Sequence, residues 1–142
     1  MPITCSIDHD RRYMVAIASG PIAWEEVRSH LLVERFEGGL SYSELIDARA
    51  ATPTWSSGQA REIVELLTTF SRKSALGPTA VVVSSDIAFG MLRMLEILLV
   101  DICIVKPFRD YEAAEQWLRD LKASRSDDHL GAERLSTYIG WQ

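Results

Sequence analysis

Cysteine and histidine are scarce in this sequence, and their spacing excludes the local motifs that they most often form. Cys5 and Cys103 do not belong to a CxxC pair, which argues against a redox motif or a zinc motif. We interpret both as small apolar side chains inside predicted strands, kept reduced in the cytoplasm. His9, His30 and His129 have no potential ligand at the spacing of a metal motif, so the sequence predicts no metal site and no cofactor.

Long apolar runs and an excess of positive charge are also lacking. No segment reaches the roughly 18 consecutive apolar residues of a transmembrane helix, and the N-terminal residues do not have the pattern of a signal peptide. The net charge of -5 argues against binding to nucleic acid, which needs many Lys and Arg side chains on one face. We therefore expect a cytoplasmic protein.

The composition and the order of predicted elements are those of one α/β domain. The chain has 142 residues, of which 47% are hydrophobic and 25% charged, and this suffices for a single core. Apolar spacing predicts five strands and four helices that mostly alternate. The strands are expected at residues 3–8, 12–19, 42–48, 79–84 and 101–105, and the helices at residues 22–36, 57–73, 87–99 and 111–123. This order predicts a single-domain, mostly parallel sheet with an antiparallel N-terminal hairpin strand.

The predicted domain covers residues 1–123, and residues 124–142 are expected to be a polar linker and a docked C-terminal tail. Within the domain, residues 44–58 are predicted to run from a buried strand through a loop into a helix. Ser56 followed by Gln59 fits a capping box, which predicts that Ser56 is the N-cap of this helix.

The predicted helix 87–99 is unusually apolar, because Arg93 and Glu96 are its only charged residues. Such a helix is covered by the core on more than one side, by a second subunit or by an apolar ligand. All three alternatives stay open from the sequence. The residues expected on the dimer or ligand face are Met91, Met94, Leu95 and Leu98.

The stretch Leu45-Ile46-Asp47, followed by Ser56-Ser57-Gly58 at a helix start, resembles the STAS domains of anti-sigma-factor antagonists of the SpoIIAA type. The element order is similar over residues 1–123. Residues 84–90 with Arg93, and residues 105–118, resemble an uncharacterised bacterial branch of the SpoIIAA-like superfamily. The resemblance implies that Ser56 stands at the phosphoacceptor position, although Trp55 replaces the acidic residue that precedes the serines in signalling STAS domains.

Polar residues are predicted to gather at the carboxyl ends of the strands, where open α/β sheets bind ligands. The expected partner-binding or ligand-binding residues are Asp47, Arg49, Trp55, Ser56, Ser57, Ser85, Asp86 and Arg109. They do not form a catalytic set, because no base accompanies the serines and no second carboxylate accompanies Asp47. The sequence therefore predicts no catalytic residues and no enzyme.

Three functions remain as hypotheses. The first is a non-catalytic, STAS-like regulatory or protein-binding module that forms a homodimer. The second is a carrier or sensor of a small apolar, lipid-like or anionic molecule, which the resemblance of the superfamily to lipid-carrying folds also suggests. The third is an enzyme of unknown class.

Overall fold

A mixed five-stranded sheet forms the centre of the domain. The computed structural model describes residues 3–35, 39–54 and 56–124, except for the side chains of Glu34 and Ser57. The strands follow the order β1-β2-β3-β4-β5 across the sheet, with β1 antiparallel to β2 and the other pairs parallel. Their bounds are Ile3–Asp8, Tyr13–Ile22, Ser43–Pro53, Thr79–Val82 and Val105–Phe108. The predicted mostly parallel sheet with an antiparallel N-terminal hairpin strand is confirmed.

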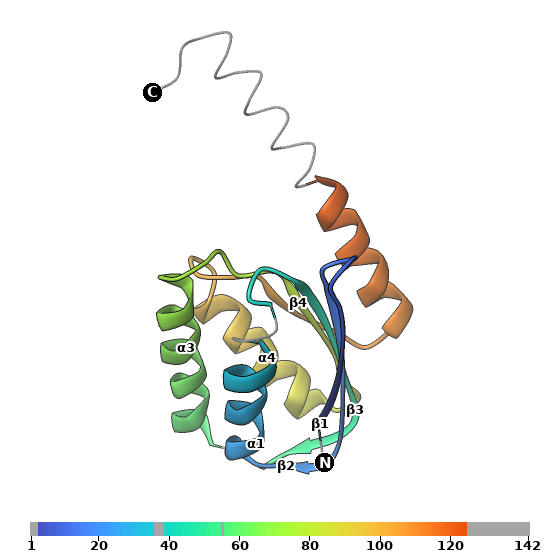
Figure 1. The fold of residues 1–142 in the computed structure, drawn as a ribbon. Coiled ribbons are helices and arrows are strands. Elements are labelled where there is room, and N and C mark those ends of the chain that lie inside the picture. The colour runs from blue at the N-terminus through green and yellow to red at the C-terminus, as the bar shows by residue number, and fades with distance from the viewer. Residues whose placement is uncertain (1–2, 36–38, 55, 125–142) are drawn as a thin grey trace, which may run out of the picture.

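The helices of the described part cover the two faces of the sheet unequally (Figure 1). The helices α1 (Trp24–Ser29, continued by η1, His30–Arg35), α3 (Ser57–Ser71) and α4 (Asp86–Leu98) lie on one face. The helix at residues 111–124 packs on the other face, where Ala114 and Leu118 contact Leu45, Ala80 and Val82. The larger core therefore lies between the sheet and α1, α3 and α4.

Strand β2 is buried mainly on one of its two faces. Its buried residues alternate, with Met14, Ala16 and Ala18 in the core and Ile17 exposed. The cluster under helix 111–124 includes only Tyr13 from β2, because this helix packs mainly on β3 and β4. One uncovered face gives the alternating pattern of a half-buried strand.

The third strand is longer than predicted. Residues 49–53, expected in a loop, continue β3 and pair with residues 19–22 of β2 after a bulge between Ile17 and Ser19. The Thr54 N–H also donates to the Ile22 carbonyl at 3.0 Å. Pairing with β2 thus overrides the weak strand preference of residues 49–53.

The prediction of a last strand at residues 101–105 is wrong, because the strand begins at Val105. The N–H groups of Ile102 and Cys103 donate to the Leu99 carbonyl at 2.8 and 2.9 Å, which keeps this segment in the turn after α4. Strand β5 contains Pro107, and proline is tolerated there because β5 is an edge strand.

The helices form near their predicted positions, but the first one changes type halfway along. The first predicted helix is an α-helix only over Trp24–Ser29 and becomes a π-helix over His30–Arg35. Helices α3, α4 and 111–124 form close to their predicted positions. The predicted docked tail at residues 125–142 lies outside the described residues. Among the described helices, none has the length and apolarity needed to cross a membrane.

Candidate functional site

A cavity of about 190 Å³ lies in the larger core, between the sheet and α1, α3 and α4. Most of its wall is apolar and comes from β2, β3, β4 and the three helices, including Ala16, Ile46, Ile63, Val81, Met91 and Leu95. Protein cores seldom contain voids larger than a water molecule. We call this space the core cavity and treat it as the candidate site.

The side chains of His30, Arg35 and Glu44 line the core cavity at the end where the parallel strands begin. His30, Arg35 and Glu44 are 6%, 3% and 1% exposed. His30 Nε2 and Glu44 Oε2 form a hydrogen bond of 2.8 Å, and Arg35 Nε lies 4.0 Å from Glu44 Oε1. The charges are therefore paired inside the core, as buried charges must be to avoid a large desolvation cost.

The π-helical turn explains how His30 and Arg35 reach the same carboxylate. Residues five apart in an α-helix lie about 140° apart around the axis and face different directions. The i→i+5 bonds of a π-helix widen the turn, which brings residues 30 and 35 closer to one face. Short π-helical segments are frequently found at functional sites.

Arg35 joins this turn to the loops that precede β3 and β4. Its Nη1 donates to the Tyr42 carbonyl at 2.8 Å, and its Nη2 donates to the Gly77 carbonyl at 2.9 Å. Burial lowers the pKa of Arg35, while the negative charge of Glu44 acts in the opposite direction. The guanidinium is thus held in place by the two carbonyls, by the Met14 sulfur at 3.7 Å and by Glu44, and it sets the position of Glu44 Oε1.

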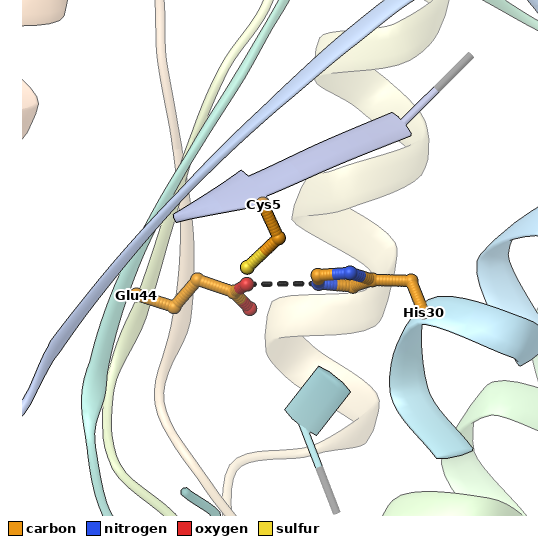
Figure 2. A group of neighbouring side chains, drawn as sticks. All are labelled: Cys5, His30 and Glu44. Carbon is orange, nitrogen blue, oxygen red and sulfur yellow. Dashed lines mark hydrogen bonds and ion pairs between the residues drawn. The ribbon is translucent and has the colours of Figure 1, made fainter. Parts of the chain in front are cut away.

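Two cysteines lie near this polar end. Figure 2 shows Cys5 of β1 pointing toward Glu44 and His30, and the donor atoms of these three residues lie within 4.8 Å of one another. Cys103 lines the core cavity, and burial raises the pKa of its thiol to about 11. Cys103 is consequently a neutral, half-buried side chain at neutral pH.

A search of the solved structures finds a protein with a similar architecture. The chain matches the crystal structure of an uncharacterised DUF3478-family protein with a SpoIIAA-like fold from Shewanella loihica PV-4, with a TM-score of 0.54 and 19% identity over 82% of this chain and 93% of that one. The fold is SpoIIAA-like. No protein-family model matches the sequence, and neither does any curated protein.

The predicted polar residues at the carboxyl ends of the strands form a small network in this SpoIIAA-like fold. Arg49 Nη2 donates to Asp47 Oδ2 at 2.8 Å, and Arg109 Nη2 donates to Asp86 Oδ1 at 2.5 Å. Ser84 links the two pairs, because its hydroxyl donates to the Arg49 carbonyl at 2.9 Å and its own carbonyl accepts from Arg109 Nη1 at 3.4 Å. Each arginine is already bound to a carboxylate, so the network does not present an obvious anion site.

The two predicted serine sites have structural roles in the SpoIIAA-like fold. Ser56 and Ser85 accept hydrogen bonds from Gln59 N–H and Ala88 N–H and cap α3 and α4. Because β3 continues to Pro53, its end lies up to about 20 Å from Asp47. The structure thus separates Ser56 from the Asp47 network. Trp55 and the Ser57 side chain lie outside the described residues.

Helix α4 divides its predicted face between two environments. Met91 and Leu95 line the core cavity, whereas Met94 and Leu98 are exposed. Ile87, Ile97 and Val100, at 78%, 68% and 72% exposure, extend the exposed apolar surface. The alternative that the core of the same chain covers this helix on more than one side is therefore wrong.

The sequence prediction did not find His30, Arg35 and Glu44. It searched the carboxyl ends of the strands, whereas Glu44 lies at the start of β3. A signal was present, because Arg35 follows the apolar residues Val27 and Leu31 at spacings of four. A charged residue on the apolar stripe of a predicted helix indicates a buried partner.

Proposed function

We propose that this protein binds a small, mostly apolar molecule in the core cavity and serves as its carrier or sensor, without catalysing a reaction. The observation that supports the proposal is an apolar cavity of about 190 Å³ with a polar end inside an otherwise packed core. An apolar cavity of about 150 Å³ can bind benzene. By that measure the core cavity fits about eight non-hydrogen atoms.

The size and the lining define the class of ligand. A short aliphatic chain or a single aromatic ring fits, whereas a whole membrane lipid does not. Glu44 and Arg35 already compensate each other's charge, which favours a ligand with one hydrogen-bonding group over one with several charges. His30 lines the core cavity, and its ring can donate or accept that hydrogen bond.

The proposal is tested by ligand-dependent thermal stability of the full chain, with 1-hexanol and hexanoate as probes. At a concentration 100 times the Kd, a bound ligand should raise Tm by about 5 to 10 °C. Ala48→Leu should abolish this rise, because Ala48 lines the core cavity and the larger side chain occupies it.

Ala50→Leu is the matched control. Ala50 lies two residues further along β3 and is exposed, so this variant should retain the rise in Tm. An unchanged Tm of the wild-type protein at saturating concentrations of both probes would contradict the proposal. An equal rise in the two variants would also contradict it.

A second proposal concerns association with another protein. We propose that two copies of the chain pair through the exposed apolar face of α4 and the turn after it, defined by Ile87, Met94, Ile97, Leu98 and Val100. Exposed apolar surface of this kind is typical of protein interfaces. The regulatory role predicted from the sequence belongs to this proposal, with Ser56 as the candidate phosphoacceptor. Ser56 is exposed at a helix N-terminus, where a phosphate is electrostatically favoured.

A further inference from the structure

Three potential metal ligands converge at the polar end of the core cavity. Cys5 comes from β1, His30 begins the π-helical turn and Glu44 lies at the start of β3. Figure 2 shows the thiol, the ring and the carboxyl group pointing toward one another, with all three donor atoms within 4.8 Å. The convergence depends on the tertiary fold, because Cys5 and His30 lie 25 positions apart in the sequence, far from the spacing of a local metal motif.

From this convergence we infer that Cys5, His30 and Glu44 bind one divalent transition-metal ion, of which Zn²⁺ is the best match. Sulfur, imidazole nitrogen and carboxylate oxygen are all zinc ligands. Mg²⁺ and Ca²⁺ prefer oxygen ligands, so the thiol selects against them. The ion would bind whether or not an organic molecule occupies the core cavity.

The spacing of the donors requires only a small adjustment. Ligand atoms of a tetrahedral zinc site lie about 3.3 to 3.7 Å apart, as the usual zinc–ligand bond lengths imply. His30 Nε2 and Glu44 Oε2 are 2.8 Å apart, and the largest separation in the group is below 4.8 Å. A movement of about 1 Å by the Cys5 side chain and a separation of His30 from Glu44 by about 0.5 Å would therefore complete the geometry.

The protons and charges balance when the ion binds. Zinc displaces the proton of the Cys5 thiol, which passes to solvent, and His30 binds the ion through Nε2 as a neutral imidazole that keeps its one remaining proton on Nδ1. The thiolate and the carboxylate then neutralise the two positive charges of the ion. A neutral centre is compatible with the low exposure of His30 and Glu44.

Arg35 would act as an outer partner of this centre. It lies next to Glu44 Oε1, and its other nitrogens are held by backbone carbonyls. This arrangement fixes the carboxylate and leaves Oε2 for the ion, as hydrogen bonds to metal ligands commonly do. The positive charge of Arg35 also opposes the ion, so we expect weaker binding than in a site made of cysteines alone.

The fourth position of the ion would face the core cavity. His30 and Glu44 line the core cavity, and zinc sites with three protein ligands keep one position for water or for a ligand. The ion could therefore hold the polar group of a molecule bound in the core cavity.

The inference is tested by titrating the metal-free full chain with Co²⁺ and Zn²⁺. We expect one ion per chain, a thiolate-to-cobalt charge-transfer band, and displacement of Co²⁺ by Zn²⁺ but not by Mg²⁺. Cys5→Ser should abolish the band, and His30→Gln should weaken Zn²⁺ binding by at least about tenfold. Circular dichroism establishes that each variant is folded.

Cys103→Ser is the matched control, because Cys103 is also a half-buried cysteine and lines the core cavity but is not one of the three proposed ligands. This variant should keep the band and the stoichiometry. Absence of a 1:1 complex in the wild-type protein would overturn the inference, as would a band that persists in folded Cys5→Ser. Ala48→Leu separates the two proposals, since it should block the organic probes and retain the ion.

Discussion

The buried pair of Arg35 and Glu44 is the most consequential contact at the scale of single residues. Glu44 is 1% exposed and has a partner on each carboxylate oxygen. Removing either charge leaves the other without compensation, which in comparable buried pairs costs about 3 to 5 kcal/mol. The contact therefore fixes the π-helical turn to the sheet and shapes the polar end of the core cavity.

Asp47 allows a test of pH dependence at the same scale. Hydrogen bonds from the Arg49 side chain and backbone hold the pKa of Asp47 below its ordinary value. The carboxylate therefore stabilises the folded state above the ordinary pKa of about 3.9, and this contribution is lost as the pH falls through the lower folded-state value. We predict that Asp47→Asn lowers the free energy of unfolding by less than about 1 kcal/mol at pH 7, because the pair lies at the surface.

Urea unfolding at several pH values measures this effect. The difference between wild type and Asp47→Asn should shrink steadily as the pH falls below about 4. In an Arg49→Gln background the same substitution should have little effect at any pH. An equal difference at pH 7 and at pH 3 would contradict the assignment of the Asp47 pKa shift to Arg49.

At the scale of elements, the cap of α3 gives the next prediction. The Ser56 hydroxyl accepts from Gln59 N–H at 3.3 Å, and the Gln59 side chain accepts from Ser56 N–H at 2.8 Å. Ser56→Ala removes the side-chain acceptor and should lower the free energy of unfolding by about 1 kcal/mol. Ser56→Asp keeps an acceptor and should remain within a few tenths of a kcal/mol of wild type.

Chemical denaturation of the three proteins at neutral pH distinguishes the outcomes. An unchanged free energy of unfolding in Ser56→Ala would mean that the capping hydrogen bond contributes nothing, and equal destabilisation by Ser56→Asp would mean that a carboxylate does not replace the hydroxyl. The comparison also shows whether a negative charge is tolerated at Ser56, as a phosphorylation site would require.

Elements with local signals were predictable from the sequence, and those set by distant contacts were not. The capping serines define the starts of α3 and α4, and alternation defines β1. The extension of β3 depends on pairing with residues 19–22, while the π-helical turn depends on Glu44 as a distant partner of His30 and Arg35. The helix and strand propensities of these residues reflect neither the pairing of β3 with β2 nor the contact with Glu44.

At the scale of the whole molecule, the two faces of the sheet have different roles (Figure 1). The face under α1, α3 and α4 contains the core cavity, and the opposite face has the smaller core under helix 111–124. The predicted site was placed at the carboxyl ends of the strands, where Asp47, Arg49, Asp86 and Arg109 do meet, whereas Ser56 lies apart. The core cavity was missed because its walls come from all five strands and from α1, η1, α3 and α4, and its volume depends on how closely these elements pack.

The exposed side of α4 leads to a prediction about assembly. Ile97 and Ile87 cost solvation free energy in a monomer, and a symmetric partner would bury them against the same face of a second copy. Light scattering after size-exclusion chromatography at micromolar concentration should therefore give twice the chain mass of 15.9 kDa. Ile97→Asp should return the mass to that of one chain, because a dimer would have to bury its charge. The matched control is Val33→Asp, at an exposed apolar position on η1, which should leave the dimer intact. A wild-type mass of one chain would exclude this interface, and the apolar face would then bind a different partner.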